Sequence, residues 1–93
     1  DVNGRVAHLL LEMGSRGGSD LIRDVPTHQV IAQMVGSTRE TVSRTMSAMV
    51  GKGLVETSSE GLRILNREGL ESAAGHMLRR RLKTPYTGQR AVT

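Results

Sequence analysis

The sequence predicts one small, mainly α-helical domain that also carries a β-hairpin. Four segments in which apolar residues recur every three or four positions indicate helices. Two short strand-like segments joined by a turn-rich tetrapeptide indicate the hairpin. The length of 93 residues suits a single domain, whose core must be aliphatic because Tyr86 is the sole aromatic residue.

The first helix is expected over residues 2–14, because its apolar residues share one face and Asp1 is a suitable N-cap. Glycines then end it in a polar loop. The apolar pair Leu21-Ile22 predicts a short edge strand, and Pro26 forces the preceding residue away from helical geometry. The apolar stripe consists of Val2, Val6, Leu9, Leu10 and Met13, and the terminating glycines are Gly14, Gly17 and Gly18.

A second helix of about nine residues is expected after Thr27, its N-cap, and Gly36 ends it. The next helix is expected to begin at Ser37. Ser37-Thr38-Arg39-Glu40 has the pattern of a capping box, in which Ser37 and Glu40 satisfy each other's free amides. The expected apolar sides are Ile31, Met34 and Val35 in the second helix, and Val42, Met46, Met49 and Val50 in the third.

The hairpin is expected from residues 54–57 and 62–65, joined by Ser58-Ser59-Glu60-Gly61. Asn66 is a suitable cap for a final helix with the stripe Leu70, Ala73, Ala74, Met77 and Leu78. This order of elements is that of a winged helix-turn-helix. We expect the domain to span residues 1–82 and residues 83–93 to be a disordered, polar tail.

Charge does not by itself indicate nucleic-acid binding. The net charge is +4, but the basic residues that follow position 78 have no acidic neighbours there, and residues 1–78 are close to neutral. The lack of aromatic residues argues against base stacking on single strands. The absence of Cys excludes disulfides and thiolate metal sites.

Localisation and completeness are expectations from the sequence. It has neither an apolar run of membrane-spanning length nor a signal-peptide pattern, so we expect a cytoplasmic protein without a membrane partner. The chain begins at Asp1 rather than Met, which suggests a fragment or a processed product.

One segment carries a family resemblance, Gly36-Ser37-Thr38-Arg39-Glu40-Thr41-Val42-Ser43-Arg44. With Thr27-His28-Gln29 upstream and Lys52-Gly53-Leu54-Val55 downstream, it resembles the C-terminal DNA-binding domain of the Crp/Fnr family of bacterial transcription regulators. The resemblance covers about residues 1–70. It implies that a cyclic nucleotide or another effector binds a domain preceding Asp1, that this chain holds no cofactor, and that the parent is a homodimer. We expect the chain alone to be monomeric.

The third helix, about residues 38–51, is the expected recognition helix. Arg39 and Arg44 can each present two donors to a guanine, and Glu40 can accept from a cytosine amino group. Ser43 is a further candidate for contact with a base. The resemblance implies a TGTGA-type half-site. The competing interpretation is a solvated helix face with a Glu40–Arg44 ion pair.

Contacts with the DNA backbone are expected mainly at helix N-termini, where free amides favour phosphates. The candidates are Thr27, His28, Gln29, Ser37, Thr38 and, on the hairpin, Arg63. The hairpin turn itself carries Glu60 and no basic residue. The run from Arg79 to Lys83 is either a solvated helix end or a phosphate-binding segment.

The resemblance implies that residues 14–20 lie where the family contacts RNA polymerase, which we treat as a hypothesis. The alternative function is a winged-helix protein-interaction module without specific DNA readout. We expect that the chain is not an enzyme, because it has neither a Walker loop nor a Ser-His-Asp order. Its three histidines also lack the spacing of a metal site.

Overall fold

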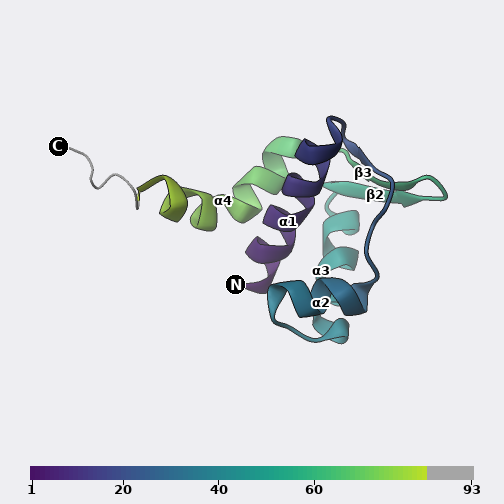
Figure 1. The fold of residues 1–93 in the computed structure, drawn as a ribbon, viewed down its shortest axis with the longest axis horizontal. Coiled ribbons are helices and arrows are strands. Elements are labelled where there is room, and N and C mark those ends of the chain that lie inside the picture. The colour runs from purple at the N-terminus through teal and green to yellow at the C-terminus, as the bar shows by residue number, and fades with distance from the viewer. Residues whose placement is uncertain (84–93) are drawn as a thin grey trace.

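The computed structural model describes the backbone of residues 1–83 and the side chains of residues 1–75. This part of the chain forms four helices and a small antiparallel sheet, as Figure 1 shows. In chain order the elements are α1 (Val2–Gly17), β1 (Leu21–Ile22), α2 (His28–Val35), α3 (Arg39–Gly51), β2 (Val55–Ser58), β3 (Gly61–Ile64) and α4 (Arg67–Lys83). The predicted winged helix-turn-helix architecture is confirmed. The predicted tail lies outside the described residues, except for Lys83, which ends α4.

Helix α1 begins as predicted but ends later. Asp1 caps it, since its Oδ1 accepts a hydrogen bond of 2.7 Å from the Gly4 amide. The prediction that the helix ends at Gly14 is wrong, because Gly14 is buried within the helix and Gly18 forms the left-handed C-cap. A methyl group at Gly14 would meet the Ile64 side chain at 3.1 Å, so the small residue permits close packing on the sheet.

The helix-turn-helix depends on Gly36 and Thr38. Gly36 adopts a left-handed φ of 73°, which reverses the chain after α2, and the following Ser37 amide bonds back to Ala32 O at 2.8 Å. Thr38 has an extended backbone and caps α3, with its Oγ1 accepting from the Thr41 amide at 3.2 Å. The predicted Ser37–Glu40 capping box is therefore wrong, because Ser37 still belongs to the turn that ends α2.

The sheet has β3 at its centre, with β1 and β2 antiparallel on either side. The predicted edge strand Leu21-Ile22 is confirmed as β1, and its residues pair with Arg63 and Leu62. The hairpin turn is shorter than expected, since Ser58 and Gly61 already pair and only two residues connect them. Leu54 lies outside β2, where its carbonyl accepts from the amides of Leu65 and Asn66.

The core lies where α1 packs on the other helices and on one face of the sheet. Its largest fully buried side chains come from every helix and both hairpin strands: Val6, Leu10, Ile31, Val42, Val55, Leu62 and Leu70. Helices α1 and α4 lie side by side in Figure 1 and make the most extensive helix pair. The cap at Asn66 is confirmed, because its Oδ1 accepts from the Gly69 amide at 2.9 Å.

Several apolar residues lie away from their predicted positions. Met34 is 54% exposed and Val50 44% exposed. At 100° per residue, Met34 lies about 60° to one side of Ile31, whereas Ala32 and Val35 extend the buried face to the other side. Val50 lies angularly between Arg39 and Ser43, on the polar side of α3. Of the predicted α4 stripe, Leu70 and Ala74 are buried, Ala73 is exposed, and the side chains of Met77 and Leu78 lie outside the described residues.

Thr45 is a polar residue at a buried position of α3. It is only 6% exposed. Its hydroxyl donates a hydrogen bond of 2.8 Å to Asn3 Oδ1 on α1, so the buried polar group is satisfied. This bond joins α3 to the first turn of α1 and helps to fix the orientation of α3 in the domain.

Candidate nucleic-acid interface

Helix α3 presents a mainly polar face, which also carries the exposed Val50. Arg39, Glu40, Arg44 and Ser47 are exposed, and Ser43 between them is half-buried. The helical period places these residues on an arc of about 140°. The buried residues Val42, Thr45, Met46 and Met49 occupy an opposing arc of about 100°. The proposed base-reading side chains therefore project from a helix whose other side is anchored in the core.

The long charged side chains on this face are free of ion pairs with the described part of the domain. Glu40 and Arg44, both described, form no salt bridge, so the intrahelical pair of the competing interpretation is absent here. The recorded polar contact of Arg44 is from Nη2 to Thr41 Oγ1 at 3.4 Å, which is long for a hydrogen bond. Arg39 and Glu40 make no side-chain hydrogen bond with a described residue. All three can reach a ligand without breaking a strong contact.

Ser43 differs from its neighbours because it already has a partner. His28 Nδ1 lies 2.7 Å from Ser43 Oγ, and this contact connects the start of α2 to the middle of α3. The sequence separates these residues by 15 positions, so only the packing of the two helices brings a predicted phosphate contact and a predicted base contact together.

The predicted backbone contacts lie at the starts of α2 and α3. Thr27 and Gln29 are exposed, and the Thr27 hydroxyl accepts from the Val30 amide at 3.2 Å. Thr38 is also exposed and has a capping hydroxyl, whereas Ser37 is half-buried in the turn. The caps leave other first-turn amides of each helix free to face a phosphate.

A groove separates the hairpin from α2 and α3. Its lining includes His28 of α2, Met46 of α3, and Thr57 and Ser58 of β2. Arg23, in the connection between β1 and α2, is exposed and also lines it. Arg23 is not among the contacts predicted from the sequence, where its one indication is that a basic residue stands shortly before the cap of α2, Thr27.

The predicted wing contact, Arg63, lies on the central strand and is exposed. It does not line this groove. Its register partners are Leu21 on β1 and Glu56 on β2, and the acidic partner places a negative charge beside it. In this groove it is Arg23, rather than Arg63, that lies beside His28 of α2.

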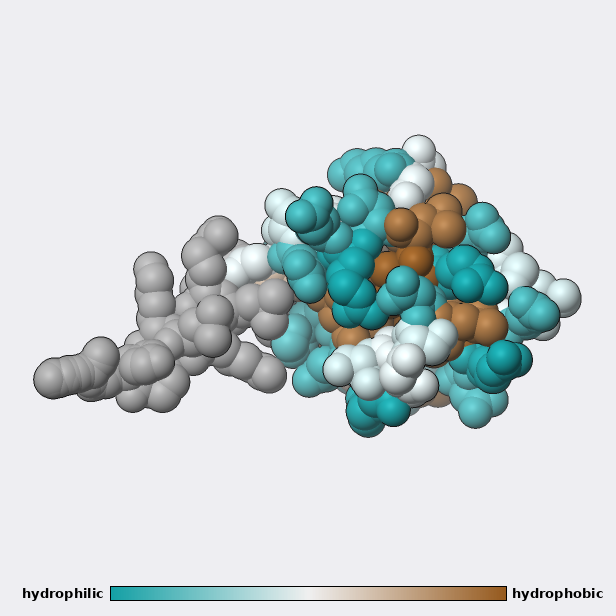
Figure 2. Space-filling view, turned by 90° about the horizontal axis from the view of Figure 1, so that it is seen from above, coloured by the Kyte–Doolittle hydropathy of each residue, from teal (hydrophilic) through white to brown (hydrophobic). Residues whose placement is uncertain are grey.

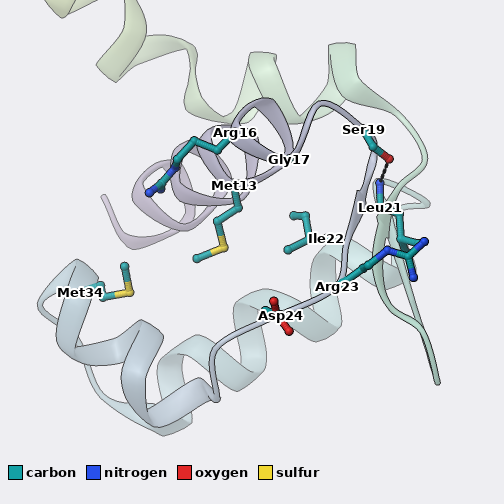
Figure 3. Close-up of a pocket in the computed structure, with 9 residues that line it drawn as sticks. All are labelled: Met13, Arg16, Gly17, Ser19, Leu21, Ile22, Arg23, Asp24 and Met34. Carbon is teal, nitrogen blue, oxygen red and sulfur yellow. Dashed lines mark hydrogen bonds between the residues drawn. The ribbon is translucent and has the colours of Figure 1, made fainter.

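A second hollow lies between α1, β1 and α2. Figure 3 shows Met13 of α1 and Met34 of α2 on opposite sides of it, with Arg16 and Arg23 also in its lining. None of the predicted DNA contacts lines this hollow. It borders the predicted polymerase-contact segment, of which residues 14–17 are helical rather than a loop.

The remaining surface of the described residues shows a hydrophobic patch and no metal-binding cluster. The side opposite α2, seen in Figure 2, has hydrophobic residues at its centre bordered by hydrophilic ones. Within residues 1–83, no three His, Asp or Glu side chains gather closely enough to hold a metal ion. No helix in that range has the length and apolar character needed to cross a bilayer.

Comparison with known proteins identifies the domain. The model of the Crp-like helix-turn-helix domain matches residues 4–73, which is most of the chain. The chain belongs to the Crp/Fnr family. This membership assigns the Crp-like domain to DNA-binding transcription regulation, and the matched relatives are regulators rather than enzymes.

Individual relatives match the Crp-like domain over about a third of their own length. A Lacticaseibacillus casei protein described as the transcriptional regulator flp is 36% identical over 73 residues, covering 78% of this chain and 33% of its own. A Mycobacterium tuberculosis protein described as a CRP-like cAMP-activated global transcriptional regulator is 33% identical, covering 80% and 35%. A solved structure described as a crp/fnr-family regulator from Eubacterium rectale has a TM-score of 0.71 at 33% identity, covering 81% and 34%.

Proposed function

We propose that this Crp-like domain reads double-stranded DNA in a sequence-specific manner, with α3 in the major groove of a TGTGA-like half-site. The observation that supports this most strongly is the exposed set Arg39, Glu40 and Arg44 on the face of α3 that points away from the core, none of which forms a salt bridge with a described residue. A major groove about 12 Å wide admits a helix of this kind.

The chemistry of the three side chains fits base edges. Each guanidinium can donate two hydrogen bonds to O6 and N7 of a guanine, and the Glu40 carboxylate can accept from a cytosine amino group. Neither Arg39 nor Arg44 forms a salt bridge with a described residue, so the guanidinium fork of each can turn toward a base. Each well-formed bidentate contact contributes about 1–3 kcal/mol of discrimination between bases.

Phosphate contacts position the helix for this readout. The N-termini of α2 and α3 supply free amides, and the exposed side chains of Thr27, Gln29 and Thr38 lie beside them. Arg23 and His28 line the groove next to the hairpin and complete a phosphate-facing rim. With residues 1–78 close to neutral, binding depends on these placed charges rather than on overall basicity.

The test is equilibrium binding of the chain and of Arg44→Ala to a half-site duplex and to random duplex. Arg44→Ala should lower affinity for the half-site about tenfold or more, and its affinity for random duplex much less. Arg5→Ala, on the exposed side of α1, removes the same charge away from α3 and should preserve half-site preference.

Two outcomes would contradict this function. Retained half-site preference in Arg44→Ala would mean that α3 is not the reading element. Wild-type binding to random duplex that fails to weaken steeply with added salt would favour the protein-interaction alternative, because phosphate binding releases counterions.

The role of a longer parent is also part of the proposal. Two copies on one operator would read a palindrome, with α3 of each copy in successive major grooves. The cyclic nucleotide or other effector would bind a domain preceding Asp1, and residues 14–20 would contact RNA polymerase. By itself this chain should sediment as a monomer and bind one half-site weakly.

A further inference from the structure

A short hydrogen bond joins the first residue of α2 to the polar face of α3. His28 Nδ1 and Ser43 Oγ are 2.7 Å apart, and both residues are half-buried. We propose that His28 is a positioning residue that sets the hydrogen-bond polarity of Ser43, so that the Ser43 hydroxyl meets DNA as an acceptor for a base amino group. This inference rests on the proposed function, because it requires α3 to lie in the major groove.

Two arrangements of protons fit the observed contact. A hydroxyl has one proton and two lone pairs, and a neutral imidazole has one N–H and one bare nitrogen. If Nδ1 of His28 is bare, it accepts the Ser43 proton, and only lone pairs of Ser43 remain for a base. If Nδ1 carries the hydrogen, it donates to Ser43, and the hydroxyl proton is free to donate to a base.

The second ring nitrogen decides between these arrangements. His28 is the first residue of α2 and lines the groove beside the hairpin, which is a favourable position for a phosphate. Phosphate oxygens only accept, so a phosphate at Nε2 requires that Nε2 carry the ring proton. The neutral ring then has a bare Nδ1, which takes the proton of Ser43. The contact between His28 and a DNA phosphate thereby makes the Ser43 hydroxyl an acceptor toward the base.

This polarity has a consequence for base preference. In the major groove, adenine N6 and cytosine N4 donate, whereas guanine O6 and N7, adenine N7 and thymine O4 accept. A hydroxyl with only lone pairs available bonds an amino group and is repelled by the acceptors. Deleting that amino group should weaken wild-type binding about fivefold, the loss expected for one hydrogen bond. Deleting a neighbouring acceptor should not weaken binding.

The experiment uses the full 93-residue chain at pH of about 8, which favours neutral imidazole groups. The half-site position that Ser43 reads is first located as the one where Ser43→Ala changes base preference. At that position, purine replaces adenine, or 2-pyrimidinone replaces cytosine, to remove the amino group. A 7-deaza analogue removes the acceptor N7 as the matched DNA control.

His28→Phe keeps a planar ring but removes both nitrogens. Gln33→Ala, at an exposed position of α2 outside the predicted contacts, is the matched control. Removing the amino group should weaken binding by the wild type and by Gln33→Ala about fivefold. Removing the amino group should leave the affinity of Ser43→Ala for the half-site unchanged. His28→Phe should bind all sequences more weakly and should lose most of its dependence on the amino group, because the released hydroxyl can then donate or accept.

Three results would overturn the proposal. The first is that removing the amino group weakens binding equally in the wild type and in His28→Phe. The second is that removing the acceptor, and not the amino group, weakens wild-type binding, and the third is that Ser43→Ala changes base preference at no position of the half-site. In each case, half-site preference that depends on Arg44 would leave the proposed function intact. A wild type with no sequence preference would overturn the proposed function itself. Even if His28→Phe fails to fold, the analogue measurements on the wild type can still refute the acceptor role of Ser43 on which the proposal depends.

Discussion

A single methyl group at Gly61 should disrupt the wing. Gly61 has a φ of 136°, and a Cβ there would collide with the carbonyl oxygen of Ile22 and lie 3.0 Å from the Cα of Arg23. These are backbone atoms at the end of β1, so no side-chain rotation can relieve the collision. Strain at such a φ costs about 1–3 kcal/mol, and moving β1 adds to it. We expect Gly61→Ala to lower the free energy of unfolding by about 3 kcal/mol.

Gly51→Ala is the matched control, because it adds the same methyl group at the end of α3, where the methyl would meet no described residue within 4 Å beyond its own turn of the helix. It should raise the free energy of unfolding by about 0.5–1 kcal/mol through helix propensity and a less flexible unfolded chain. Urea unfolding followed by far-ultraviolet circular dichroism measures both variants. A Gly61→Ala variant within about 0.5 kcal/mol of the wild type would show that the close approach of β1 to Gly61 is wrong.

The same unfolding assay tests two further features. Thr38→Ala should lower the free energy of unfolding by about 1 kcal/mol, because Thr38 caps α3. Ser37→Ala should lower it much less, since the Ser37 hydroxyl bonds to no described residue. A larger loss in Ser37→Ala than in Thr38→Ala would mean that Ser37 is the cap. His8→Leu should raise the free energy of unfolding by about 1 kcal/mol, because both ring nitrogens of His8 are buried without a hydrogen bond to a described residue. His8 Nε2 lies 3.5 Å from Glu12 Oε2 without a hydrogen bond between them. A loss of stability in His8→Leu would mean that this contact stabilises the fold more than the unsatisfied nitrogens destabilise it.

Local sequence patterns were sufficient for the order and type of the elements. Asp1, Thr27 and Asn66 cap the helices at which the sequence places them, because a cap bonds amides only two or three residues away. The edge strand at Leu21-Ile22 and the glycine turn after α2 could also be predicted from local sequence. The capping residue of α3 was not, because Ser37 and Thr38 are both good caps and the length of the preceding turn chooses between them.

The polar face of α3 was also readable from sequence, since the helical period alone separates Arg39, Glu40 and Arg44 from the buried residues. Contacts between distant segments were not. The bonds from Thr45 to Asn3 and from His28 to Ser43 span 42 and 15 positions, and the groove joins Arg23 to the start of α2. The conformational preferences of neighbouring residues do not determine which residues so far apart in the sequence come into contact. These contacts arise only when the helices and sheet pack on a shared core, which decides which polar groups of neighbouring elements come within bonding reach.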